Sequence, residues 1–270
     1  MAALNYEQIQ SFGNVTQQVI DAAIDEFMEY VYEGMTIDEL VDAATNVAMK
    51  FSYLGSELGA QWYDLCSEMA GLNVEPAELS DFDAAQIQSR VKWAVESAPE
   101  TSTIGDTIGQ FLQTQVQNSI RATGNANLWR DYERGMAGGR WARVPVGDTC
   151  AWCLMLASNG AWYLSEKTAI GADPGHYHDG CNCIAVYHSN AESISGYSQL
   201  TKYKEMYYEA ENARSANASG KQPYDEELQS RIDRAKAVHK AKYDAGETDI
   251  PWTKYNETLI VMRYQNEGLK

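Results

Sequence analysis

The sequence predicts an α+β protein in three parts: a mostly α-helical N-terminal region over residues 1–139, a small metal- or disulfide-clamped α+β module over 140–190, and a largely helical C-terminal region over 191–270. Three observations support this division. Apolar residues recur at helical spacing on both sides of the module, cysteines and histidines crowd inside it, and Gly and Pro supply its turns. At 270 residues the chain is long enough to bury a substantial core.

The N-terminal region is predicted to be a succession of helices. The first ends at Gly34, and a capping box formed by Thr36 and Glu39 starts the next, which we expect to stop near Gly55. The apolar faces of these two helices are expected to consist of Val15, Val19, Ala22, Ala23, Phe27 and Val31, and of Leu40, Val41, Ala44, Val47, Ala48 and Phe51. A further helix over Leu58–Met69 places Cys66 on its apolar side, which indicates a buried free thiol.

Three more helices complete the N-terminal region. Gly71 to Pro76 forms a break, and a helix with Ser80 as its N-cap is expected to run to Val95 with Ile87, Val91, Trp93 and Val95 as its apolar positions. The last two are expected over Gly105–Ile120 and Leu128–Met136, followed by a glycine-rich exit.

The C-terminal region also alternates helices and breaks. Helices are expected over Ser195–Arg214 and from Pro223 to about Tyr243, with Gly246 ending the second. The segment Ile250–Met262 fits either a strand or a helix.

The charge of the chain excludes some partners. With 21 basic and 38 acidic residues the net charge is −17, which repels phosphate backbones, so no sequence-specific nucleic acid is expected as a partner. The longest uncharged run, Thr149–Ser165, is shorter than the ~20 residues of a membrane span. No secretory signal is visible in the first thirty residues. We therefore expect no membrane partner, and a reducing compartment that favours thiolate ligands over disulfides.

The module contains the most informative motif in the sequence. Four of the five cysteines lie in it, in the arrangement Cys150-x-x-Cys153 followed by His176-x-His178-x-x-Cys181-x-Cys183. A Cys-x-x-Cys turn brings two thiolates to one ion, and a second pair from a later segment completes a tetrahedron. We expect a structural Zn²⁺ held by four of the residues Cys150, Cys153, His178, Cys181 and Cys183, with His176 as a spare donor. Either His178 or Cys183 can complete the set.

Two other interpretations of the cysteines remain open. Disulfides between the pairs are compatible with the spacing, and a thiolate beside an imidazole could act as a nucleophile. Nothing in the sequence marks one cysteine as a nucleophile, whereas clustering favours shared ligation. Around the clamp, Ala161–Leu164 and Ile184–Tyr187 are expected to form short strands.

The cysteine segment resembles a known family, the minor head or head-morphogenesis proteins of tailed bacteriophages of the phage Mu F-like class. The resemblance covers Arg140–Tyr187 and rests on Asp148 ahead of the first cysteine pair, Gly160 with Trp162-Tyr163, and the run from His178 to Val186. The segment from Cys150 to Gly160 is most similar to versions from phages of actinobacteria. Two departures, His178-Asp179 in place of His-Pro and Asn182 in place of a basic residue, leave the ligand spacing intact.

The resemblance implies a minor capsid protein, present in few copies inside the head, that docks to the portal protein and the major capsid protein during assembly. Such a protein would occur in the host cytoplasm during assembly and then in the virion, and no enzymatic activity is expected of it. The alternative is a Cys-dependent enzyme or an effector delivered with the phage genome. A zinc-dependent regulator that binds nucleic acid is disfavoured by the net charge.

Overall fold

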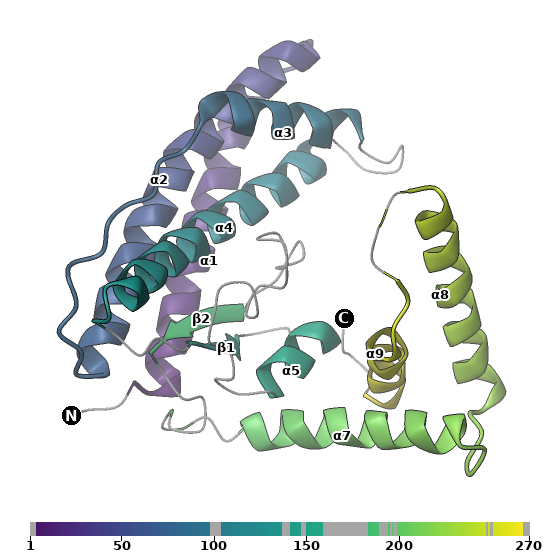
Figure 1. Cartoon of the computed structure of the whole chain (residues 1–270). Coiled ribbons are helices and arrows are strands. Elements are labelled where there is room, and N and C mark those ends of the chain that lie inside the picture. The colour runs from purple at the N-terminus through teal and green to yellow at the C-terminus, as the bar shows by residue number, and fades with distance from the viewer. Residues whose placement is uncertain are drawn as a thin grey trace. The chain divides into compact units, whose positions relative to one another are not determined.

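The computed structural model describes residues 4–97, 104–136, 141–146, 150–158, 183–188, 194, 196, 199–246, 248 and 251–266. The chain divides into two compact units (Figure 1). The first unit comprises residues 1–146 and 161–197, and the second comprises 147–160 and 198–270. Most described residues are helical and a two-stranded sheet accompanies them, so the predicted helix-dominated α+β class agrees with the structure.

Helix α1 spans Tyr6–Tyr30 and begins at Asn5, whose side chain accepts a hydrogen bond from the Gln8 backbone while the Gln8 side chain accepts one from Asn5. Its buried stripe consists of Ile9, Phe12, Thr16, Ile20, Ala23 and Phe27. The prediction that Val15, Ala22 and Val31 belong to the buried face is wrong, because all three are exposed. The buried stripe includes Thr16 instead, and a pattern of hydrophobic residues does not identify a buried polar residue.

Helix α2 spans Ile37–Met69. The predicted capping box is confirmed: the Thr36 hydroxyl accepts the Glu39 N–H at 3.2 Å, and the Glu39 carboxylate accepts the Thr36 N–H at 2.8 Å. All six predicted apolar positions from Leu40 to Phe51 are buried. The predicted end near Gly55 is wrong, because the helix continues through it.

Helix α4 spans Ile104–Glu133 and packs along α2. Two separate helices were predicted here, and one continuous helix is present. A Cβ on Gly55 would lie 3.0 Å from the Val116 carbonyl oxygen, and one on Gly59 would lie 2.4 Å from that of Ile120. The two glycines therefore serve the close approach of α2 and α4 rather than ending α2.

The connection from α2 to helix α3, Ala84–Glu96, has no regular structure over 72–83. The predicted break is confirmed, but the predicted N-cap is wrong. Asp83 caps α3 by accepting the Ala85 N–H, whereas the Ser80 N–H donates to Ser56 on α2. Ile87, Val91 and Val95 are buried as expected, whereas the expectation for Trp93 is wrong because it is 70% exposed.

Strand β1, Trp141–Pro145, pairs antiparallel with β2, Cys183–Tyr187. The strand predicted over Ile184–Tyr187 is confirmed, and the sequence assigned none to 141–145. Strand β2 is buried along its whole length and packs on α1, α2 and α4. The strand predicted over 161–164 lies outside the described residues.

The second unit contains α5 (Ala151–Ser158), α7 (Gln199–Ala218), α8 (Glu226–Asp244) and α9 (Lys254–Gln265). Its core comprises Ala151, Leu154, Met155, Met206, Ala210, Leu228, Ile232, Leu259, Val261 and Met262. Asp225 caps α8 through the Leu228 N–H, so this helix begins three residues after the predicted start at Pro223. The open choice for Ile250–Met262 is settled as a helix from Lys254 onward, where α9 begins.

Residues from 140–190 contribute to both units, and the division into three segments stays a prediction. The existence of a clamped module over 140–190 stays a prediction, since 159–182 lie outside the described residues. No helix within the described ranges combines the length and the apolar character that a membrane crossing requires.

The close approach of α2 and α4 gives a first prediction. Gly59→Ala should destabilise the protein by at least ~1 kcal/mol in urea unfolding followed by circular dichroism, although Ala is favoured over Gly in helices by about 1 kcal/mol. The reason is the contact of the new Cβ with the Ile120 carbonyl.

Gly109→Ala is the matched control for this prediction. Its Cβ would meet only Ile24, at 3.9 Å, so this variant of α4 should be stabilised by about 0.5 kcal/mol or more. Equal effects of the two substitutions would contradict the close packing.

Candidate functional site

The first half of the predicted metal site lies at the start of α5. Cys150 immediately precedes the helix, and its sulfur accepts the backbone N–H of Cys153 at 3.4 Å. Cys153 lies one turn later and is buried. An amide directed at the first sulfur of a Cys-x-x-Cys turn stabilises a thiolate there, so this pair fits the donor chemistry of a zinc site.

The other predicted ligands are placed only in part. Cys183 is the first residue of β2 in the first unit, where it is buried and its carbonyl accepts a hydrogen bond from Arg121 at 3.3 Å. His178 and Cys181, and the spare donor His176, lie outside the described residues. Among the residues that the structure describes, no three His, Cys, Asp or Glu side chains form a group suited to a metal ion. The zinc site thus stays a prediction.

Cys66 differs from the cysteines of the motif. It is a free, buried cysteine on α2, as predicted, and burial raises the pKa of its thiol to about 12. A thiol of this kind remains protonated at neutral pH and is a poor ligand and a poor nucleophile.

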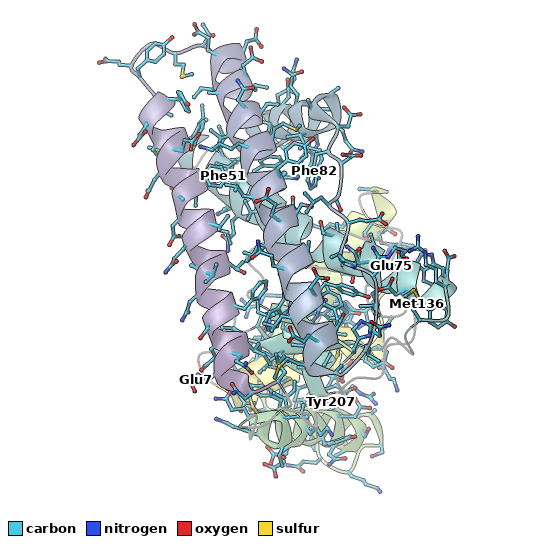
Figure 2. The ribbon with its side chains drawn as sticks, turned by 90° about the vertical axis from the view of Figure 1, so that its left-hand side faces the viewer. Glu7, Phe51, Glu75, Phe82, Met136 and Tyr207 are labelled. Atoms are coloured by element: carbon cyan, nitrogen blue, oxygen red, sulfur yellow. The ribbon has the colours of Figure 1, made fainter. Side chains whose placement is uncertain are left out.

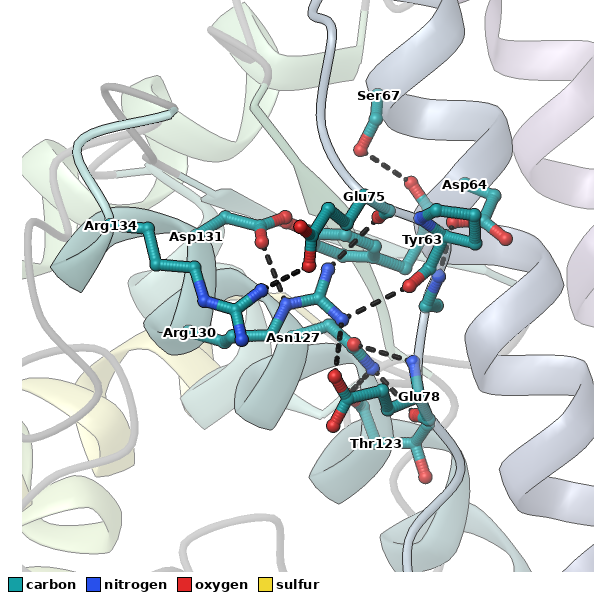
Figure 3. Close-up of polar contacts among 12 residues, drawn as sticks. Tyr63, Asp64, Ser67, Glu75, Glu78, Thr123, Asn127, Arg130, Asp131 and Arg134 are labelled. Carbon is teal, nitrogen blue, oxygen red and sulfur yellow. Dashed lines mark hydrogen bonds and ion pairs between the residues drawn. The ribbon is translucent and has the colours of Figure 1, made fainter.

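A cluster of charged and polar groups surrounds Asp131 on α4 (Figure 3). This side chain is fully buried. Its carboxylate accepts the Tyr63 hydroxyl at 2.6 Å and the Arg130 Nε at 2.7 Å. Burial by itself raises the pKa of Asp131, but the hydrogen bonds from Arg130 and Tyr63 outweigh it and hold that pKa below its ordinary value.

Arg130 and Asn127 extend this cluster to the irregular segment 72–83. Arg130 donates to the carbonyls of Glu75 and Pro76 at 2.9 and 3.0 Å. Asn127 donates to the Glu78 carbonyl and accepts the Glu78 N–H, each at 2.8 Å. Figure 3 shows these contacts leading from α4 to one stretch of backbone. They fix the segment against the two long helices and satisfy its backbone groups.

His188 joins the same cluster from the end of β2. Its Nε2 lies 3.2 Å from the Tyr63 hydroxyl, and its backbone has a φ of +56°. Burial lowers the pKa of His188 to about 4, and burial together with Asp131 raises the pKa of Tyr63. At neutral pH the imidazole is therefore neutral, the phenol protonated and the Asp131 carboxylate ionised. That carboxylate is fully buried and is hydrogen-bonded to Arg130 and Tyr63, so the geometry of the cluster suits a structural role.

The sequence analysis did not identify this cluster. Its members come from α2, the segment 72–83, α4 and the residue after β2, so no local spacing connects them. The only local signal is the charge pair Arg130-Asp131 near the end of a helical pattern, and adjacent charges of this kind are common on solvated helix faces.

The Asp131 cluster gives a second prediction. Arg130→Gln should lower the free energy of unfolding by about 3 kcal/mol, because Asp131 would remain buried without its charged partner and two loop carbonyls would lose their donor. Denaturant unfolding measures the loss, and limited proteolysis should show faster cleavage within 72–83.

Arg134→Gln tests whether any arginine at this end of α4 has the same effect. Arg134 pairs with Glu75, and both side chains are about half exposed. Its loss should cost no more than about 0.5 kcal/mol. A similar cost for the two arginines would contradict the structural role of the buried cluster.

The family comparison covers most of this structure. A family model described as VG15 protein matches residues 5–210, from the start of α1 to within α7. No curated protein and no solved structure gives a match. The match spans more than half of the chain and includes both the Asp131 cluster and the cysteine segment, and it indicates a phage-encoded protein. The chain belongs to the VG15 protein family.

Proposed function

We propose that this protein is a minor capsid protein of a tailed phage, a low-copy component inside the head that docks to the portal protein and the major capsid protein during assembly. The observation that carries the proposal is the family match, which indicates a phage-encoded protein over residues 5–210. Within that range, the pattern from Asp148 to Val186 resembles the Mu F-like head proteins and narrows the role to head assembly.

The first unit supports a structural role. Its long helices α2 and α4 are in close contact, and buried polar groups connect them to an irregular segment that would otherwise be free to move. Such a unit presents fixed surfaces, which suits docking because little conformational entropy is lost on binding. The net charge of −17 supports protein partners, since an acidic surface repels packaged DNA.

We further propose that Zn²⁺ closes the cysteine segment. Cys150 and Cys153 would supply two ligands, and two of His178, Cys181 and Cys183 would supply the others. Bound zinc would act as a structural cross-link and would perform no chemistry. The amide of Cys153 directed at the Cys150 sulfur favours the thiolate that such a cross-link needs.

The zinc proposal gives a third prediction. Protein purified without chelators should contain about one zinc per chain by elemental analysis, and Cys150→Ser or Cys153→Ser should lose it. Both variants should also melt at a lower temperature, because zinc binding contributes to folding. Cys66→Ser is the control: it should keep its zinc, since this thiol is buried on α2 with a raised pKa.

Thiol counting separates zinc from the alternatives. Zinc ligands become reactive only after denaturation or chelation, whereas disulfides remain unreactive until they are reduced. Protein without zinc and with intact disulfides would contradict the zinc proposal while leaving the head-assembly proposal in place.

Head assembly is the subject of a fourth prediction. Deleting the gene should leave the phage able to lyse its host but with far fewer infectious, DNA-filled heads, counted by plaque assay and electron microscopy. Mass spectrometry of purified wild-type virions should detect the protein in fewer copies than the major capsid protein. A plasmid copy of the wild-type gene should restore normal heads.

The enzyme or effector alternative makes a different prediction. A Cys-dependent enzyme would lose its function in a Cys150→Ser variant that remains folded and packaged. Normal heads after gene deletion, or absence of the protein from virions and assembling heads, would contradict the proposed function.

A further inference from the structure

The turn between α1 and α2 exposes a group of apolar side chains. Helix α1 ends at Tyr30, and a turn containing Gly34 at a φ of +90° leads to α2. The group, which we call the hairpin tip, consists of Met28, Tyr30, Val31, Tyr32 and Ile37, with exposed fractions between 39% and 57%. In Figure 2 the tip lies at the end of the hairpin opposite Glu7.

Acidic residues surround the hairpin tip. Between residues 21 and 42 the chain has eight acidic residues, Asp21, Asp25, Glu26, Glu29, Glu33, Asp38, Glu39 and Asp42, and no Lys or Arg. The first basic residue of the whole chain is Lys50, which pairs with Glu26 at 2.5 Å. The apolar tip is therefore flanked along both helices by acidic residues, which we call the acidic rim.

We propose that the hairpin tip binds a basic amphipathic segment of another protein. The apolar side of that segment would cover the tip, and its Lys or Arg side chains would face the acidic rim. Exposed apolar patches with polar rims mark protein interaction sites, and Tyr is enriched among the side chains that dominate such contacts. Charge complementarity then selects a basic partner. The inference does not depend on the proposed role in head assembly.

The charge also argues against other occupants. Two copies of this chain meeting tip to tip would bring sixteen carboxylates together, twice the eight of one copy, and in each copy Lys50 neutralises only Glu26 among them. Nucleic acid and anionic membranes carry the same sign of charge as the rim and would be repelled. A segment with one aliphatic and one basic face is complementary to both parts of the site, because its aliphatic face can cover the apolar tip and its basic face can pair with the acidic rim.

The experiment uses the full-length chain and two labelled peptides of about 18 residues, or five helical turns. One peptide is an amphipathic helix with Leu on one face and Lys on the other, and the second has Ser in place of every Leu. Fluorescence anisotropy should show that the Leu-containing peptide binds at least about tenfold tighter, a difference of ~1.4 kcal/mol. Its affinity should fall as salt is added.

Paired variants locate the binding site. Tyr30→Ser combined with Tyr32→Ser should weaken binding of the Leu-containing peptide at least about tenfold. Glu29→Gln combined with Glu33→Gln should weaken binding and reduce its salt dependence. Their matched controls, Tyr208→Ser with Tyr243→Ser and Glu205→Gln with Glu209→Gln, change exposed side chains of the second unit and should bind like the wild type.

Several outcomes would overturn the proposal. Equal binding of the two peptides, or equal effects of tip and control variants, would show non-specific attraction of an acidic protein. Self-association that disappears in the Tyr30 and Tyr32 variant would make a second copy the occupant. Tip-dependent binding to neutral phosphatidylcholine vesicles, without binding to the Leu-containing peptide, would make the occupant a lipid surface. Circular dichroism of each variant confirms that a loss of binding is not a loss of fold.

Discussion

The first unit depends on the close contact between α2 and α4. Gly55 and Gly59 lie one turn apart on α2; a side chain would collide with the backbone of α4 at Gly59 and would crowd it at Gly55. The short separation lets small hydroxyl groups meet between the helices, as Ser56 and Thr123 do at 2.8 Å. Glycine destabilises the interior of an isolated helix. Its presence at these two positions is explained by the close packing of α4 that it allows.

The same contact creates the position that β2 occupies. Beyond the glycine pair, the Trp62 indole of α2 donates to the Ala185 carbonyl at 2.7 Å, and Arg121 of α4 donates to that of Cys183. Tyr187 reaches the backbone of Gly124, where any Cβ would overlap its hydroxyl. The strand that ends the cysteine segment is therefore held by side chains of both helices. A change in the helix spacing would displace the backbone of Cys183 as well.

The features predicted correctly from the sequence are those that depend on residues close together along the chain. The capping box at Thr36 and the apolar face from Leu40 to Phe51 depend only on neighbours along the chain, and both are confirmed. The predicted helix end at Gly55 was wrong because the low helix propensity of glycine is outweighed there by the packing of α2 against α4. Strand β1 was missed because a short segment ending in Pro145 gains its stability from pairing with β2, some forty residues away.

The candidate site could be predicted only to the extent that it forms a linear motif. The spacing of Cys150 and Cys153 predicts a thiolate pair, which stays a prediction, and the structure adds a hydrogen bond from the Cys153 amide to the Cys150 sulfur. The Asp131 cluster has no such spacing, because Tyr63, Asp131 and His188 meet only after three elements have packed. Burial also shifts the pKa values of these residues away from neutrality. A solvent-exposed His beside a Tyr would suggest acid-base chemistry, whereas His188 and Tyr63 both stay uncharged at neutral pH.

The burial of some arginines affects the charge of the protein surface. Arg121 is buried and Arg130 is almost so, because helix α4 uses their guanidinium groups to bind loop and strand carbonyls or to neutralise Asp131. A chain with only 21 basic residues that buries some of them leaves fewer to moderate its acidic exterior. Each arginine that is buried to stabilise the fold is one positive charge fewer on the surface. The polar core of the first unit therefore makes the surface available to partners more negative.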